Sequence, residues 1–249
     1  MCIRDRVTRL PRRFFSAHRT GQVQSGQVRS EQIRRRQVTC TPGLFWQNEG
    51  MGLHLERMVA GEWYNPAEDP DLAEAYAKCQ RELARFNATR VEEDALRAEI
   101  LRGLWGEFGE GSVVRQPLVC EFGFNIRVGR DCFVNFDALF LDTNTVTLGD
   151  SVQVGSRVQF VTPIHPIDDV EMRAAGWERS APIVVGDNVW IAAGVTVCAG
   201  VTIGENSVIG SGSVVTRDIP ANVLAVGTPC RPVRVLHQPE EPGNPTLGA

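Results

Sequence analysis

Long apolar runs are absent from the 249-residue sequence. None approaches the roughly 20 consecutive apolar residues that a transmembrane helix needs, which excludes a membrane-spanning protein. Paired cysteine motifs are absent as well, because the seven cysteines are widely spaced and include no Cys-x-x-Cys pair. This usage favours scattered reduced thiols in a cytoplasmic protein over a disulfide framework or a zinc site.

Acidic residues are scarce at the N-terminus. Residues 1–40 hold ten arginines against Asp5 and Glu31, so this segment carries a net charge of about +8 and the remainder about −12. The remainder is therefore acidic, which argues against nucleic acid as its main partner. Residues 1–48 show no sustained periodicity and are interpreted as a disordered or non-native leader, with a transit peptide and a basic arm as the alternatives.

A six-residue rhythm dominates the C-terminal half of the sequence. Between residues 185 and 220 an aliphatic residue returns at every sixth position: Val185, Ile191, Val197, Ile203, Ile209 and Val215. A period of six fits neither a helix nor an alternating strand and is typical of a parallel β-helix built from hexapeptides. Each hexapeptide supplies one short strand and one corner, and about three of them close one triangular turn.

The rhythm begins earlier and is interrupted once. Two preceding sets share the six-residue step and are displaced by a two-residue insertion around Asn144: Val128, Val134 and Phe140, then Leu148, Val154 and Phe160. The rhythm then stops for 25 residues before Val185. Because such an excursion costs loop entropy, we expect it to carry function.

Residues 52–105 have a helical pattern instead. Asp71 is the expected cap of a long helix with the apolar stripe Leu72, Ala75, Tyr76, Cys79, Leu83 and Phe86. A second helix is expected over residues 91–104, with Leu96, Ile100, Leu101 and Leu104 apolar. This hairpin would cover the open first coil of the solenoid. The predicted organisation is an all-β solenoid domain at 109–236, a helical cap at 49–108, the leader at 1–48 and a flexible Pro- and Gly-rich tail at 237–249.

His165 lies within the excursion, between Ile164 and Pro166. Imidazole suits a reaction that needs a base near neutral pH. No Gly-x-Ser-x-Gly nucleophile motif accompanies it, and Cys198 is expected to be a small filler at a corner. The residues therefore favour direct attack by a hydroxyl that His165 deprotonates over a covalent intermediate.

Several longer motifs between residues 58 and 234 follow the order and nearly the spacing of one family. They are Ala60-Gly61-Glu62-Trp63-Tyr64-Asn65-Pro66, Arg85-Phe86-Asn87, Phe124-Asn125-Ile126-Arg127-Val128-Gly129, Asn135-Phe136, His165-Pro166, Pro182-Ile183-Val184-Val185-Gly186-Asp187-Asn188-Val189-Trp190-Ile191 and Gly227-Thr228-Pro229-Cys230-Arg231. In these motifs the chain resembles the maltose and galactoside O-acetyltransferases of the hexapeptide-repeat family.

The resemblance implies a left-handed parallel β-helix, a homotrimer with active sites between subunits, and transfer of acetyl from acetyl-CoA to a sugar hydroxyl without a metal. It implies that His165 is the general base and that Asn135 is a catalytic amide near it. The implied acceptor-binding residues are Glu121, Asn135, Asp142 and Trp177. The implied coenzyme-binding residues are Trp190, Ala193, Ser211, Thr216, Arg217, Arg231 and Arg234, among which the guanidinium groups suit the phosphates of CoA.

Four residues depart from the family pattern. Glu121 stands where many relatives have Asp or Ser, and Trp177 is bulkier than usual, so the particular sugar does not transfer. Ala192 replaces a Gly after Trp-Ile, and Ala181 replaces a frequent Lys. The alternatives are acetylation of an amino sugar, an antibiotic or serine, and a non-catalytic trimeric scaffold. A zinc carbonic anhydrase would need three histidines along the coils, where the repeats have none besides His165.

Overall fold

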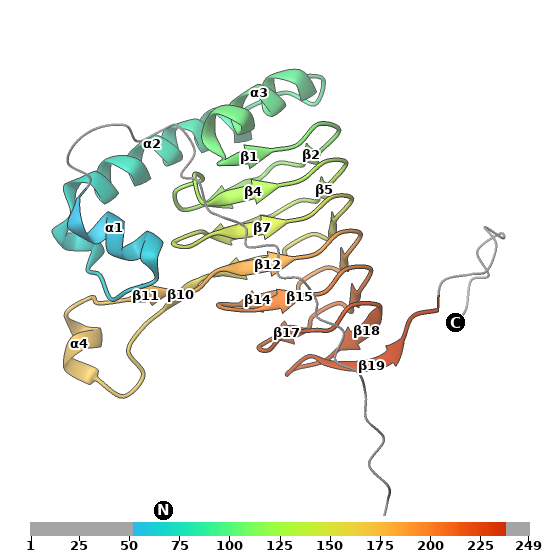
Figure 1. The fold of residues 1–249 in the computed structure, drawn as a ribbon. Helices are drawn as coiled ribbons and strands as arrows, with labels where there is room; N and C mark the ends of the chain where they lie inside the picture. Colours follow the sequence, from blue (N-terminus) through green and yellow to red (C-terminus); the bar gives the residue numbers. More distant parts are fainter. Residues whose placement is uncertain (1–51, 238–249) are drawn as a thin grey trace, which may run out of the picture. The chain divides into compact units, whose positions relative to one another are not determined.

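The computed structural model describes residues 52–237 of the chain. The predicted leader, and the predicted tail apart from His237, lie outside these residues. The described part is a solenoid of short parallel strands, with helices at its N-terminal end and one long excursion (Figure 1). The prediction of a parallel β-helix with a helical cap is confirmed. Within residues 52–237, no helix combines the length and the apolar character needed to cross a bilayer.

Five successive coils each contribute one strand to each of three parallel sheets, and β18 begins a sixth coil. Sheet 1 consists of β1 (Glu107–Phe108), β4 (Ile126–Val128), β7 (Val146–Leu148), β12 (Ile183–Val185) and β15 (Thr202–Ile203). Sheet 2 consists of β2 (Val113–Val114), β5 (Phe133–Val134), β8 (Gln153–Val154), β13 (Trp190–Ile191), β16 (Val208–Ile209), β18 (Val223–Val226) and the antiparallel β19 (Arg231–Val235). Sheet 3 consists of β3 (Leu118–Cys120), β6 (Ala138–Leu141), β9 (Gln159–Val161), β14 (Thr196–Cys198) and β17 (Val214–Val215). The solenoid starts at Glu107, slightly before the boundary predicted at residue 109.

The six-residue rhythm determines the number of residues in each coil. Val185 pairs with Ile203, 18 residues further on, so three hexapeptides close one coil as predicted. Both side chains are buried, because alternate residues of a strand point to opposite faces and the inward residue stacks on its equivalent in the next coil. Phe140 and Phe160 show this stacking inside the solenoid, with ring centroids 4.8 Å apart.

The cap contains helices α1 (Leu53–Ala60), α2 (Pro70–Asn87) and α3 (Asp94–Leu104), with the 3-10 turn η1 (Pro66–Glu68) between α1 and α2. The N-cap of α2 is Asp69, whose carboxylate accepts the Asp71 N–H at 2.9 Å, so the prediction that Asp71 caps this helix is wrong. Pro70 at the first helical position moves the start earlier, because its missing N–H costs nothing there. Tyr76, which was predicted to belong to the apolar stripe of this helix, is 49% exposed and lies at the edge of the buried face.

Two separate apolar clusters are buried. The larger, which we call the solenoid core, fills the coils and includes residues of α2 and α3: Cys79, Leu83, Phe86, Ile100, Leu101 and Leu104. The smaller, which we call the cap core, consists of Leu55, Met58, Tyr64, Leu72, Ala75 and Phe122. The second half of α2 and α3 therefore cover the first coil as predicted, whereas α1 belongs to a second core.

The excursion leaves the solenoid between β9 and β12. It contains β10 (Pro163–Ile164), α4 (Val170–Ala174) and β11 (Arg179–Ser180), and β10 pairs with β11 in antiparallel fashion. In Figure 1 this arm projects from the coils on the side where α1 lies, with α4 at its tip.

Candidate active site

A segment of the cap pairs with the excursion beside its two strands. Tyr64, which follows α1, donates its N–H to the carbonyl of Glu178 at 2.9 Å and accepts the Glu178 N–H at 3.0 Å. Residues directly opposite each other in an antiparallel pair point to the same face. The side chains of Tyr64 and Glu178 consequently lie together, and the cap holds the strand that carries Glu178.

His165 and Glu178 form the centre of the candidate site. Ile164 pairs with Arg179, so the next residue along each strand brings His165 opposite Glu178. Nε2 of His165 lies 3.4 Å from Oε2 of Glu178. The His165 side chain is 56% exposed, whereas that of Glu178 is 12% exposed. The arrangement is an accessible imidazole backed by a carboxylate that is nearly buried, which suits a general base.

Tyr64 fixes the other oxygen of Glu178. Its hydroxyl donates a hydrogen bond to Oε1 of Glu178, and the whole residue is buried. Burial raises the pKa of Tyr64 well above its ordinary value, and the hydrogen bond to Glu178 adds to the effect. The hydroxyl therefore stays protonated and acts as a donor that orients the carboxylate.

Glu121 is a second carboxyl group near this pair. It follows β3 and is partly exposed. Burial, together with the negative charges of Glu178 and Asp142, raises the pKa of Glu121 to about 7. A substantial fraction of Glu121 is thus neutral near pH 7 and can donate a hydrogen bond.

Asp142 has a structural position. Its carboxylate is completely buried and accepts the N–H groups of Glu121 and Phe122 at 2.9 Å and of Gly123 at 2.7 Å. Burial raises the pKa of Asp142 to about 6, while these N–H groups act in the opposite direction. An acceptor contact for Asp142 stays a prediction, while its hydrogen bonds fix the turn that presents Glu121.

Asn135 lies away from His165 within one chain. It follows β5 at the corner between sheets 2 and 3, whereas His165 leaves from the corner between sheets 3 and 1. The width of sheet 3 separates them, and the four residues of β6 alone span roughly 13 Å. A single chain therefore does not bring the predicted amide to the predicted base.

Trp177 lies against the cap. Its ring meets the imidazole of His54 edge-on, with centroids 5.8 Å apart. Because neighbouring residues alternate across a strand, Trp177 and Glu178 point to opposite faces. An acceptor contact for Trp177 stays a prediction.

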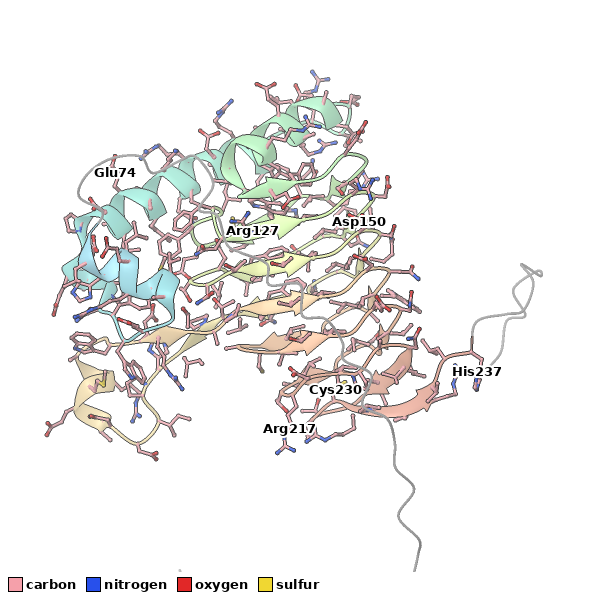
Figure 2. All side chains as sticks on the ribbon, in the orientation of Figure 1. Glu74, Arg127, Asp150, Arg217, Cys230 and His237 are labelled. Carbon is pink, nitrogen blue, oxygen red and sulfur yellow. The ribbon has the colours of Figure 1, made fainter. Side chains whose placement is uncertain are left out.

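The residues predicted to bind the coenzyme are all exposed: Trp190, Ala193, Ser211, Thr216, Arg217, Arg231 and Arg234. Ala193 and Ser211 lie at the corner of Asn135. Thr216 and Arg217 lie at the corner from which His165 leaves. Figure 2 shows the side chain of Arg217 pointing outward from the last coils. Four of the seven residues are accordingly divided between the same two corners as the catalytic candidates, whereas Trp190 lies on β13 and Arg231 and Arg234 lie on β19.

Two family models match the chain. The maltose acetyltransferase hexapeptide capping motif matches residues 57–109, and the bacterial transferase hexapeptide (six repeats) matches residues 182–217. Nodulation protein L of Rhizobium meliloti (strain 1021) is 43% identical over 176 residues, which are 71% of this chain and 95% of that protein. The chain belongs to the maltose and galactoside O-acetyltransferase family.

Solved structures of this hexapeptide family have the same fold as this chain. A maltose O-acetyltransferase from Clostridium difficile 630 superposes with a TM-score of 0.73 at 41% identity, covering 76% of this chain and 100% of that one. A galactoside acetyltransferase in complex with coenzyme A superposes with a TM-score of 0.71 at 37% identity, covering 76% and 92%. The predictions of the family and of an acyltransferase are confirmed.

Sequence reasoning missed two residues of this candidate site. Glu178 follows His165 by 13 positions, and no periodic pattern joins two strands of an irregular arm. Tyr64 stands in one of the family motifs, but its distance in sequence from Glu178 concealed their pairing. Only the folding of the excursion back onto the cap reveals the pair.

Proposed function

We propose that this protein is an acetyl-CoA-dependent O-acetyltransferase whose acceptor is a sugar hydroxyl. The observation that carries the proposal is the His165–Glu178 pair, held on the excursion at 3.4 Å. The complex of a related galactoside acetyltransferase with coenzyme A supports the choice of donor. The name of that relative and that of the maltose enzyme support a sugar acceptor.

His165 acts as the general base. It takes the proton from the acceptor hydroxyl, whose oxygen then forms a bond to the carbonyl carbon of the acetyl thioester. A backbone N–H of the coil steadies the negative charge on the carbonyl oxygen. The carbon–sulfur bond then breaks, and His165 returns the proton to the leaving thiolate, so that it ends the cycle neutral.

Glu178 orients the imidazole and stabilises its protonated form. The negative charge of the carboxylate faces the positive charge that the imidazole carries while it holds the proton. Tyr64 prevents the carboxylate from turning away, because its buried hydroxyl donates to the second oxygen. Glu121, partly neutral near pH 7, supplies a hydrogen bond to the sugar.

We further propose a homotrimer in which Asn135 of one copy completes the site of the next. The outward residues of sheet 3 are mainly apolar, with Val119, Leu139, Leu141, Val161, Cys198 and Val214 against Gln159 and Thr196. Those of sheet 1 are mainly polar, with Glu107, Arg127, Thr147 and Thr202 against Val184. An apolar outer face suits burial against another copy. Such packing would bring the corner of Asn135 in one copy towards the corner of His165 in its neighbour.

A thiol-release assay tests the reaction. Acetyl-CoA is incubated with the purified protein and with each member of a panel of mono- and disaccharides, amino sugars and serine. We expect the free thiol of CoA to be released when a sugar is present. His165→Ala should lower kcat by about 10²- to 10⁴-fold. Asp168→Asn, an exposed change on the same excursion, is the matched control. Equal turnover of the two variants would disprove the role of His165.

Mixing two variants tests the shared site. If neighbouring copies contribute His165 and Asn135, then co-expressed His165→Ala and Asn135→Ala chains form some sites with both native residues. Activity should then exceed that of either variant alone. A mixture no more active than the separate variants would contradict a shared site.

A further inference from the structure

Helix α1 contacts the excursion through His54. His54 is the second residue of α1, its imidazole faces the turn between α1 and η1, and the sequence alone assigned it no role. Its Nδ1 accepts the backbone N–H of Asn65 at 2.9 Å. Its Nε2 lies 3.5 Å from Oε2 of Glu68, and its ring meets that of Trp177.

Asn65, whose backbone is bonded to His54, also binds the tip of the excursion through its side chain. The residue is 4% exposed, and its side-chain amide donates to the carbonyl of Ala175 and to Oε1 of Glu68, both at 3.1 Å. Ala175 is followed by Gly176, which turns the chain with φ +83° before Trp177. His54 thus contacts the excursion directly at Trp177 and indirectly at Ala175.

These contacts enclose the residues that hold Glu178. Tyr64 immediately precedes Asn65, and Glu178 immediately follows Trp177. The backbone pair between Tyr64 and Glu178 is therefore flanked by the contacts of His54 on both strands. A displacement of either strand would move the carboxylate relative to His165.

We propose that His54 is a positioning residue for the His165–Glu178 pair, acting through Asn65 and Trp177. The inference rests on the proposed function for its effect on turnover. It assigns α1 a part in catalysis, in addition to filling the cap core. His54 itself touches no reacting atom, so its removal should disturb geometry and not abolish the chemistry.

Two substitutions of His54 separate its contacts. His54→Ala removes both the acceptor and the ring, and we expect kcat to fall about tenfold with an unchanged KM for acetyl-CoA, since small misplacements of catalytic groups are costly. His54→Asn places an amide oxygen near the position of Nδ1, so kcat should recover to within about threefold of the native value. Val59→Ala, at an exposed position of α1, is the control.

Amide hydrogen exchange provides a readout that needs no activity. In His54→Ala, exchange of residues 175–178 should accelerate by about tenfold, while that of the solenoid strands stays unchanged. Unaltered exchange at 175–178, or no recovery in His54→Asn, would overturn the proposal. A native protein that transfers no acetyl group would instead refute the proposed function, and exchange would still decide whether His54 holds the excursion.

Discussion

The solenoid and the cap with its excursion are built by different rules. In the solenoid each strand pairs with the equivalent strand of the neighbouring coils, and many hexapeptides place two apolar residues, such as Val185 and Val189, in one continuous core. The cap core has six members, and they come from α1, α2, the Tyr64 segment and a corner after β3. The regular region supplies stability and position, whereas the chemical groups lie where the irregular region meets it.

The two regions also satisfy their backbone groups differently. Coil residues bond to the coils on both sides, for example Gly149 N–H to the carbonyl of Val185 at 2.9 Å. The excursion depends on a short antiparallel pair, on the two bonds between Tyr64 and Glu178, and on the bond from the Asn65 amide to the Ala175 carbonyl. Fewer supporting contacts imply easier local opening, so the excursion should exchange amide hydrogens faster than the coils.

The largest expected effect is on the solenoid core. Phe160→Ala would leave a cavity beside Phe140 in a region that cannot collapse without breaking the stack, so the free energy of unfolding should fall by about 3–5 kcal/mol. Chemical denaturation measures this loss. Tyr76→Ala, at a half-exposed position of the cap, should change stability by less than about 0.5 kcal/mol. Similar losses in the two variants would show that the stacked core is not the stabilising unit.

Much of this solenoid could be predicted from the sequence, because the period of six requires one inward residue per strand. The insertion around Asn144 and the excursion before Val185 were predicted as breaks in that period. Helix boundaries were less accurate, since Asp69 and not Asp71 caps α2. Local residue preference allows both acids as caps, and Pro70, which favours the first helical position, decides for Asp69.

The site could be predicted only in part. His165 was found because it departs from the repeat, but its partner Glu178 lies in a segment without any period. For Asp142, sequence position does not reveal that three N–H groups surround a buried carboxylate, so its structural part in the Glu121 turn was not predicted. The separation of Asn135 from His165 depends on which corner of the coil each occupies, and that follows from the three-dimensional winding.

An intermediate effect is expected at Glu121, on the boundary between the two regions. Its pKa is raised from 4.5 to about 7, so the folded state binds a proton more tightly than the unfolded state between these values. Stability contributed by the neutral form is lost as the pH rises through this window. Glutamine stays neutral, so Glu121→Gln does not lose this stability as the pH rises. Its free energy of unfolding should exceed that of the native protein at pH 8 by on the order of 1–3 kcal/mol, with little difference at pH 4.

Urea denaturation at several pH values measures this gap. Glu110→Gln, an exposed change at a solenoid corner, is the matched control and should give a gap that does not widen with pH. If the gap for Glu121→Gln is equally independent of pH, then burial and the neighbouring carboxylates do not raise the pKa of Glu121 in the folded protein.

The smallest effect separates function from stability most sharply. Tyr64→Phe keeps the ring in the cap core but removes the donor to Oε1 of Glu178, so the carboxylate can rotate away from His165. We expect kcat to fall about tenfold, since misplacing a catalytic group costs about this much even when the fold is intact. The unfolding transition of the solenoid should move little, because Tyr64 lies outside its core. Steady-state kinetics and denaturation of one preparation compare the two. A variant that loses stability in proportion to turnover would mean that Tyr64 supports the whole chain; loss of turnover alone assigns the hydroxyl to the orientation of Glu178.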